Sequence, residues 1–267
     1  MPGLRAGEIE LDYERSGSGP PLLLIMGMSG TALHWGEPFL ELLRRDFEVI
    51  TYDHRGVGAS SPLTGGVTIA QLAQDASALL SALELDSAHV LGISMGGMIA
   101  QELALEHPEQ VRTLTLGCTY CGGPDSTQGP PWVLEQLTEG MMSGDLDRVM
   151  RTTWEVNVSE SLAGDADAYA QFLAIAQRRA VAVPVIMAQL QACFAHDTSA
   201  RLHELTMPTL VIHGTDDLML PVENGRQIAR LVAGSRLEIF EGVGHLFFWE
   251  RPERSAELLR SHAAVPA

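Results

Sequence analysis

The 267-residue chain contains no lysine, so all of its basic residues are arginines. Chemistry that needs a lysine amine is therefore excluded, which removes a Schiff base to pyridoxal phosphate, a Walker A loop and a Ser-Lys dyad. Basic residues number 17 and acidic residues 34, which gives a formal net charge of −17. Because nucleic acids and anionic membranes bind basic surfaces, we expect neither as a partner.

Cysteines and long apolar runs are also scarce. Of the three cysteines, Cys118 and Cys121 have the C-x-x-C spacing of a redox or zinc half-site. No second pair exists, so we predict free thiols, no metal and no cofactor. No apolar run reaches about 18 residues, and the first five residues lack a signal-peptide core, so we expect no stable membrane association and a cytoplasmic location.

Short apolar runs alternate with helical patterns through the first half of the chain. Buried strands are predicted at 22–26, 47–52, 88–92 and 111–116, and helices at 35–45, 68–85 and 95–107. This alternation predicts an α/β protein with a mostly parallel sheet and helices on both faces. Residues 8–13 alternate polar and apolar side chains, which predicts a half-exposed edge strand before the first buried one.

The pattern changes after about residue 120. Helices are predicted around 132–142, 145–156, 165–179 and 183–194, with no strand among them; strands then return at 207–213 and 235–240, each followed by a helix. We therefore predict a core in two parts, residues 1–120 and 201–267, interrupted by a helical cap at 121–200. Such an insert would cover the strand ends, where its many methionines and aromatic residues suit an apolar substrate.

Gly92-Ile93-Ser94-Met95-Gly96 lies where a predicted strand turns directly into a predicted helix. A corner this sharp strains the backbone of the serine, and the flanking glycines remove Cβ atoms that would collide. The geometry lifts the Ser94 hydroxyl beyond the sheet edge. It also points the N–H of Met95, at a helix N-terminus, toward a developing oxyanion. We predict that Ser94 is a nucleophile and that Met95 contributes to an oxyanion hole.

A serine nucleophile needs a general base, and nine histidines compete for that role. His245 is our choice because it lies in a glycine-rich loop directly after the last strand. The remaining histidines have plainer explanations: His107 at a helix end, His89 at a strand start, His34, His54 and His213 near strand ends where they could line a pocket, and His196, His203 and His262 at the surface.

The base in turn needs a carboxylate that holds its tautomer. Asp216 and Asp217 both follow a strand end, and the G-x-x-D spacing after Gly214 favours Asp217. The predicted catalytic residues are thus Ser94, Asp217 and His245, in that order along the chain.

These motifs together resemble the α/β-hydrolase superfamily over nearly the whole chain. The resemblance is carried by Met26-Gly27-Met28, by the turn 53–60 with its glycines and a buried-looking ion pair, by the serine elbow, and by the segments containing Asp217 and His245. It implies the α/β-hydrolase fold, with a helical cap inserted after the sixth strand. It also implies that the Met28 N–H completes the oxyanion hole, although Met26 stands where the family usually has histidine.

The resemblance implies hydrolysis of a carboxylic ester of a small to medium apolar substrate through an acyl-enzyme. The chain is similar to small carboxylesterases, 3-oxoadipate enol-lactonases and cofactor-free haloperoxidases. Hydrolysis of a lactone or enol-lactone, hydrolysis of a C–C bond and perhydrolysis would use the same triad. A ligand-binding module without turnover is an alternative of a different class.

Substrate contacts are less specific in the sequence, and homo-oligomerisation stays open. Residues at the expected strand ends and in the cap are candidates for binding the substrate: Gly27, Trp132, Trp154, Leu218 and Leu246. A substrate bearing a carboxylate would favour an arginine of the cap, and the candidates are Arg148, Arg151, Arg178 and Arg179, each of which also fits a solvated helix face.

Overall fold

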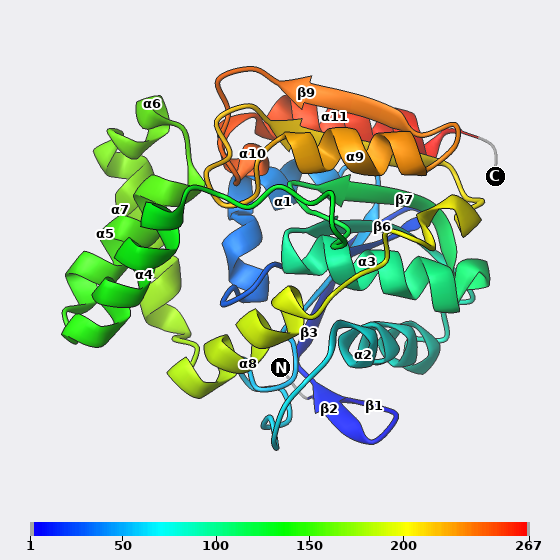
Figure 1. The fold of residues 1–267 in the computed structure, drawn as a ribbon. Coiled ribbons are helices and arrows are strands. Elements are labelled where there is room, and N and C mark those ends of the chain that lie inside the picture. Colours follow the sequence, from blue (N-terminus) through cyan, green and yellow to red (C-terminus); the bar gives the residue numbers. More distant parts are fainter. Residues whose placement is uncertain (1–2, 266–267) are drawn as a thin grey trace.

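A seven-stranded sheet forms the centre of the computed structural model, which describes residues 3–265 (Figure 1). The strand order is β3-β5-β4-β6-β7-β8-β9, and only β3 is antiparallel to its neighbour. The strands are β3 (Tyr13–Gly17), β4 (Pro21–Ile25), β5 (Glu48–Tyr52), β6 (Ala88–Ile93), β7 (Val111–Gly117), β8 (Thr209–Gly214) and β9 (Arg236–Phe240). The predicted mostly parallel sheet is therefore present.

Helices cover both faces of this sheet, as the apolar runs require. Every residue of β4, β6 and β8 is buried, because a parallel sheet is packed on both sides. One face packs against α2 (Ile69–Ala82), α3 (Met95–Glu106) and α9 (Glu223–Leu231). The other packs against α1 (Glu37–Leu43), α10 (Phe247–Glu250) and α11 (Pro252–Ala263). Thr68 caps α2 by accepting the Gln71 N–H.

Five α-helices lie between β7 and β8. They are α4 (Pro131–Ser143), α5 (Leu146–Asn157), α6 (Glu160–Ala163), α7 (Ala166–Arg178) and α8 (Val183–Phe194). In Figure 1, α4 to α7 gather at the left of the sheet, and α8 leads back beneath the core. We call residues 131–194 the cap helices. The predicted domain boundaries at 120 and 200 stay a prediction.

The start of the chain differs from the expected single edge strand. A separate hairpin is formed by β1 (Leu4–Ala6) and β2 (Ile9–Leu11), and β3 begins only after Asp12. Asp12 breaks the strand because its buried N–H donates to Ser60 Oγ and its carboxylate pairs with Arg179. The cap helices therefore follow β7, which is the seventh strand along the chain and the fifth strand of the main sheet. The prediction that the cap follows the sixth strand was wrong.

No single helix within residues 3–265 is long and apolar enough to cross a bilayer. Among these residues, only α7 and α8 taken together have the length and composition of a membrane-spanning segment, and the two helices are bent by 107° relative to each other.

Candidate active site

Ser94 stands at the corner between β6 and α3 with a strained backbone, at φ 55° and ψ −123°. A Cβ at Gly92 would overlap the Gly96 carbonyl, and a Cβ at Gly96 would overlap the carbonyl of Ile25. Both glycines are thus required by close backbone approach, as the motif predicted. The Ser94 N–H donates to the Gly117 carbonyl at 3.0 Å, which fixes the corner against β7.

Asp217 and His245 are brought together from loops that follow β8 and β9. His245 Nδ1 donates to Asp217 Oδ2 at 2.8 Å, and both side chains are buried. Asp217 Oδ1 accepts the N–H groups of Met219 and Leu220, each at 2.9 Å. These bonds fix the carboxylate in the orientation in which it holds the imidazole.

The charge of Asp217 is stabilised inside the protein. Burial alone would raise its pKa, but the imidazoles of His245 and His213 outweigh burial and hold the pKa well below its ordinary value. His213 Nε2 lies 3.2 Å from Asp217 Oδ2 and donates to the Leu220 carbonyl at 2.7 Å. The sequence analysis placed His213 near a pocket and missed this contact, although its i, i+4 spacing to Asp217 was visible.

Ser94 and His245 lie at the same end of the sheet. Ser94 is bonded to Gly117, and the next residue, Cys118, has its sulfur within 4.8 Å of a His245 nitrogen and an Asp217 oxygen. Among residues 3–265, no hydrogen bond joins the Ser94 hydroxyl to His245. Catalytic contacts of this kind often tighten only when substrate binds. The joint action of the three residues stays a prediction.

The Met26-Gly27-Met28 loop is held by side chains that the sequence analysis did not assign to it. His54 Nε2 donates to the Met26 carbonyl at 2.9 Å; burial lowers the pKa of His54 and favours its neutral form. A Cβ at Gly27 would lie 3.2 Å from Ser94 Cβ, so the loop faces the serine. His54 thus supports the loop in which Met26 replaces the usual histidine.

The cap helices contact the loop that carries His245. Glu250 Oε1 accepts the N–H of Gly244 at 2.7 Å and that of Ser159 at 2.9 Å. Glu250 Oε2 also accepts the Ser159 hydroxyl, and the Leu246 N–H donates to the Asn157 carbonyl at 2.9 Å. Glu250 therefore joins the histidine loop to the segment between α5 and α6, a role that its position in the sequence did not indicate.

Cys118, Asp217 and His245 are also the one group among the described residues whose donor atoms could converge on a metal ion. Burial raises the pKa of the Cys118 thiol, which favours the protonated form that binds metals poorly. The Asp217 and His245 donors already bond each other. The cluster therefore fits an imidazole oriented by a carboxylate better than a metal site. Cys118, Cys121 and Cys193 are free, as predicted for the C-x-x-C pair.

Two of the predicted substrate contacts have contrasting environments. Trp154 is fully buried and packs against Phe172 and Trp249, with ring centroids 5.2 and 5.8 Å away. Trp132 is 43% exposed. Trp154 thus has a packing role between the cap helices and α10, whereas direct contact of Trp132, Leu218 or Leu246 with a substrate stays a prediction.

Among the four candidate arginines of the cap, Arg179 does not lie on a solvated helix face. Arg179 pairs with the buried carboxylates of Asp12 and Asp53, at 2.7 Å from Asp53 Oδ2. The ion pair predicted within the turn 53–60 is therefore wrong: Asp53 pairs with Arg179 of the cap helices, and Arg55 pairs with Asp75.

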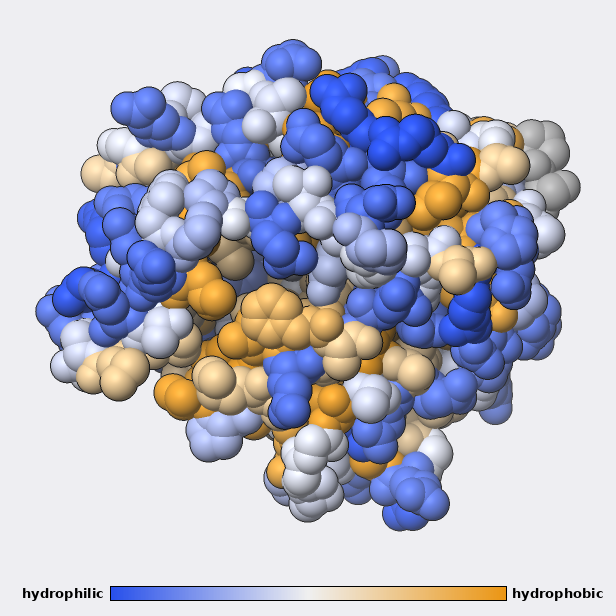
Figure 2. All heavy atoms as spheres, in the orientation of Figure 1, coloured by the Kyte–Doolittle hydropathy of each residue, from blue (hydrophilic) through white to orange (hydrophobic). Residues whose placement is uncertain are grey.

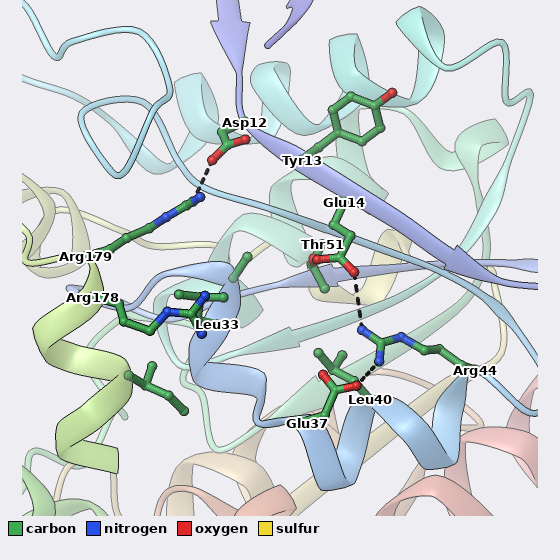
Figure 3. Close-up of a pocket in the computed structure, with 12 residues that line it drawn as sticks. Asp12, Tyr13, Glu14, Leu33, Glu37, Leu40, Arg44, Thr51, Arg178 and Arg179 are labelled. Carbon is green, nitrogen blue, oxygen red and sulfur yellow. Dashed lines mark hydrogen bonds and ion pairs between the residues drawn. The ribbon is translucent and has the colours of Figure 1, made fainter. Parts of the chain in front are cut away.

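Arg178 and Arg179 line a cleft of about 150 Å³ (Figure 3). Arg44 also lines this cleft, where it pairs with Glu14 and Glu37. None of the three predicted catalytic residues lines this cleft.

Two histidines expected at the surface are buried. His196 is 6% exposed, and burial lowers its pKa to about 4. His262 is 5% exposed and its Nε2 donates to the Leu114 carbonyl at 3.1 Å. The sequence around His196 and His262 did not indicate that these side chains point into the core. His203 is exposed, as predicted.

A family model described as the alpha/beta hydrolase fold matches residues 20–252, which span both parts of the core and the cap helices. The chain belongs to the α/β-hydrolase family. This hydrolase has the fold and the family that the motifs implied. Its membership rests on the match over most of the chain, independently of the geometry at Ser94.

Relatives of the hydrolase carry different activities in their names. It is 30% identical to "Putative carbamate hydrolase RutD" of Azorhizobium caulinodans, over 97% of each chain. It is 29% identical to "Putative non-heme bromoperoxidase BpoC" of Mycobacterium tuberculosis, over 97% of this chain and all of that one. A solved thermophilic esterase from Thermogutta terrifontis is 26% identical with a TM-score of 0.79, covering 97% and 95% of the two chains. The family is therefore shared while the reaction varies.

Proposed function

We propose that this hydrolase cleaves carboxylic esters of small to medium apolar substrates through an acyl-enzyme. The observation that carries the proposal is the buried Asp217–His245 pair at the same end of the sheet as the strained Ser94 elbow. A carboxylate that stays ionised holds the imidazole with its proton on Nδ1, which leaves Nε2 free to accept a proton from a serine.

In the proposed reaction the Ser94 hydroxyl forms a bond to the substrate carbonyl carbon and its proton passes to His245 Nε2. The N–H groups of Met28 and Met95 stabilise the resulting oxyanion. The ester C–O bond then breaks, and the alcohol leaves with the proton from His245. Water attacks the acyl-enzyme, its proton passes through His245 to Ser94, and the carboxylic acid is released.

The same residues support other reactions, which a substrate panel separates. The esterase neighbour favours a carboxylic ester, whereas the RutD and BpoC names point to a carbamate or to peroxide chemistry. Lactones, enol-lactones and C–C bonds of diketones complete the panel. A ligand-binding module would retain a ligand and turn over no member of it.

The first test is acylation of Ser94. With a p-nitrophenyl acyl ester, wild type should give a burst of nitrophenolate, and the Ser94→Ala variant should give none and lose about 10⁴- to 10⁶-fold in turnover. Ser87→Ala is the matched control, because Ser87 lies just before the start of β6, whereas Ser94 lies just after its end. Wild type without a burst and without labelling by a fluorophosphonate would contradict the acyl-enzyme.

A further inference from the structure

Gln189 is a buried amide in a cap helix whose outer side is apolar. It lies in α8 and is 1% exposed, whereas Val183, Met187 and Phe194 of the same helix are exposed. Figure 2 shows a hydrophobic area over the lower middle of the molecule, where Figure 1 places α8. The polar side chain therefore faces inward, opposite to the usual arrangement of a surface helix.

The orientation of this carboxamide is fixed by its partner. The backbone N–H of Ser29 donates to Gln189 Oε1 at 3.0 Å, and an N–H can be met only by the oxygen of the amide. Nε2 is consequently the free end, and it is buried with no hydrogen-bond partner among the described residues. A buried donor without an acceptor is costly, so its retention needs an explanation.

The bonded oxygen of Gln189 attaches its amide to the turn that faces the nucleophile. Ser29 follows Met28, and the turn is closed by the Gly30 N–H donating to the Gly27 carbonyl at 3.3 Å. Gly27 at its start approaches Ser94, since a Cβ there would lie 3.7 Å from Ser94 Oγ. Ser29 itself has a φ of 58°, a strained value for serine that the bond to Gln189 helps to hold.

We propose that Gln189 Nε2 donates a hydrogen bond to a second oxygen of the substrate, next to the scissile carbonyl. The preferred esters would then carry a hydroxyl, keto or ether oxygen near the reacting bond. The proposal rests on the ester-hydrolase function above, in which the Met28 and Met95 N–H groups serve the oxyanion. A site built to donate to a substrate oxygen discriminates strongly against the analogue that lacks it.

Matched pairs of esters test this on either side of the carbonyl. Ethyl 3-oxobutanoate is compared with ethyl 3-methylbutanoate, in which a methyl group replaces the keto oxygen, and 2-methoxyethyl acetate with butyl acetate. For wild type we expect kcat/KM to favour the oxygenated member of at least one pair by about tenfold or more. Turnover of the esters without such a preference would overturn the role of Gln189 and leave the hydrolase function intact. No turnover of any ester would overturn both.

Two variants separate donation from support of the turn. Gln189→Glu keeps an oxygen for the Ser29 N–H and, at a pH where the new carboxyl is ionised, removes the Nε2 donor, so the kcat/KM ratio between the oxygenated and the plain ester should fall toward one. Gln189→Met removes both and should also slow the plain ester. Gln191→Glu, on the exposed side of α8, is the matched control. Equal losses on both members of each pair in Gln189→Glu, or a buried water bonded to Nε2 in a ligand-bound crystal structure, would overturn the proposal.

Discussion

Asp216 and Asp217 are adjacent in sequence but differ in burial and in hydrogen bonding. Asp217 is buried and accepts hydrogen bonds from His245, Met219 and Leu220. Asp216 is exposed, and its carboxylate accepts only the Thr215 hydroxyl among the described residues. A general base that must be aligned needs the rigid partner, so we assign the orienting role to Asp217.

The assignment predicts opposite outcomes for two equivalent substitutions. Asp217→Asn should lower kcat by about 10⁴-fold, because an amide cannot hold the imidazole in the productive tautomer. Asp216→Asn should stay close to wild type. Steady-state kinetics on a p-nitrophenyl ester, with thermal unfolding to confirm folding, checks both. Comparable activity of the two variants would remove Asp217 from the proposed mechanism.

At the scale of elements, the cap helices are bonded to three loops at the strand ends. Gln189 of α8 holds Ser29, Arg179 after α7 pairs with Asp53, and Ser159 before α6 shares Glu250 with the histidine loop. The placement of the cap is therefore coupled to the placement of the proposed catalytic groups. A small shift of such groups has a large effect on rate.

Glu250 allows this coupling to be tested. Glu250→Ala leaves the Gly244 and Ser159 N–H groups without their acceptor, so we expect a loss of about 1–3 kcal/mol in the free energy of unfolding and about tenfold or more in kcat. KM should change less, because the histidine loop and not the binding surface is loosened. Kinetics and urea denaturation measure the two effects.

Two further variants define the cause. Glu250→Gln keeps an acceptor oxygen and should restore most of the activity, and Glu253→Ala, on the exposed side of α11, should behave as wild type. A Glu250→Ala variant that is less stable but has wild-type kcat would limit Glu250 to a structural role.

Over the whole molecule, two buried histidines, His89 and His196, and the half-buried His34 link stability to pH. Burial lowers the pKa of His34, His89 and His196 to about 4, from an ordinary value near 6.5. Between these values the unfolded chain binds more protons than the folded one. The stabilisation is therefore complete above about pH 6.5, and it falls as pH drops toward 4.

We expect the urea midpoint at pH 5 to lie below that at pH 7, with an upper bound of about 2 kcal/mol of stability lost per histidine. Reduced repulsion within the acidic chain opposes part of this loss. His89→Asn can still bond Thr113, the partner of His89 Nδ1, and should reduce the difference between the two midpoints. Equal midpoints in wild type would contradict the linkage.

The sequence predicted those features that depend on local chemistry. The elbow needs glycines where backbones approach, so Gly92 and Gly96 identified the position of Ser94. Continuous apolar runs identified the buried strands, because a parallel sheet is covered on both faces. The sequence did not predict the short helices α6 and α10 or the break in the edge strand at Asp12, since these features depend on contacts with residues far away along the chain.

The sequence by itself thus determined the alternation of strands and helices and the position of the serine elbow, which follow from periodicity and spacing along the chain, and its motifs resemble the family to which the chain belongs. Only the tertiary structure decided which partners meet: His213 with Asp217, Arg179 with Asp53, and Gln189 with Ser29. The last of these pairs lies 160 positions apart. Such contacts have no local signature, because they arise from the packing of elements that the chain order separates.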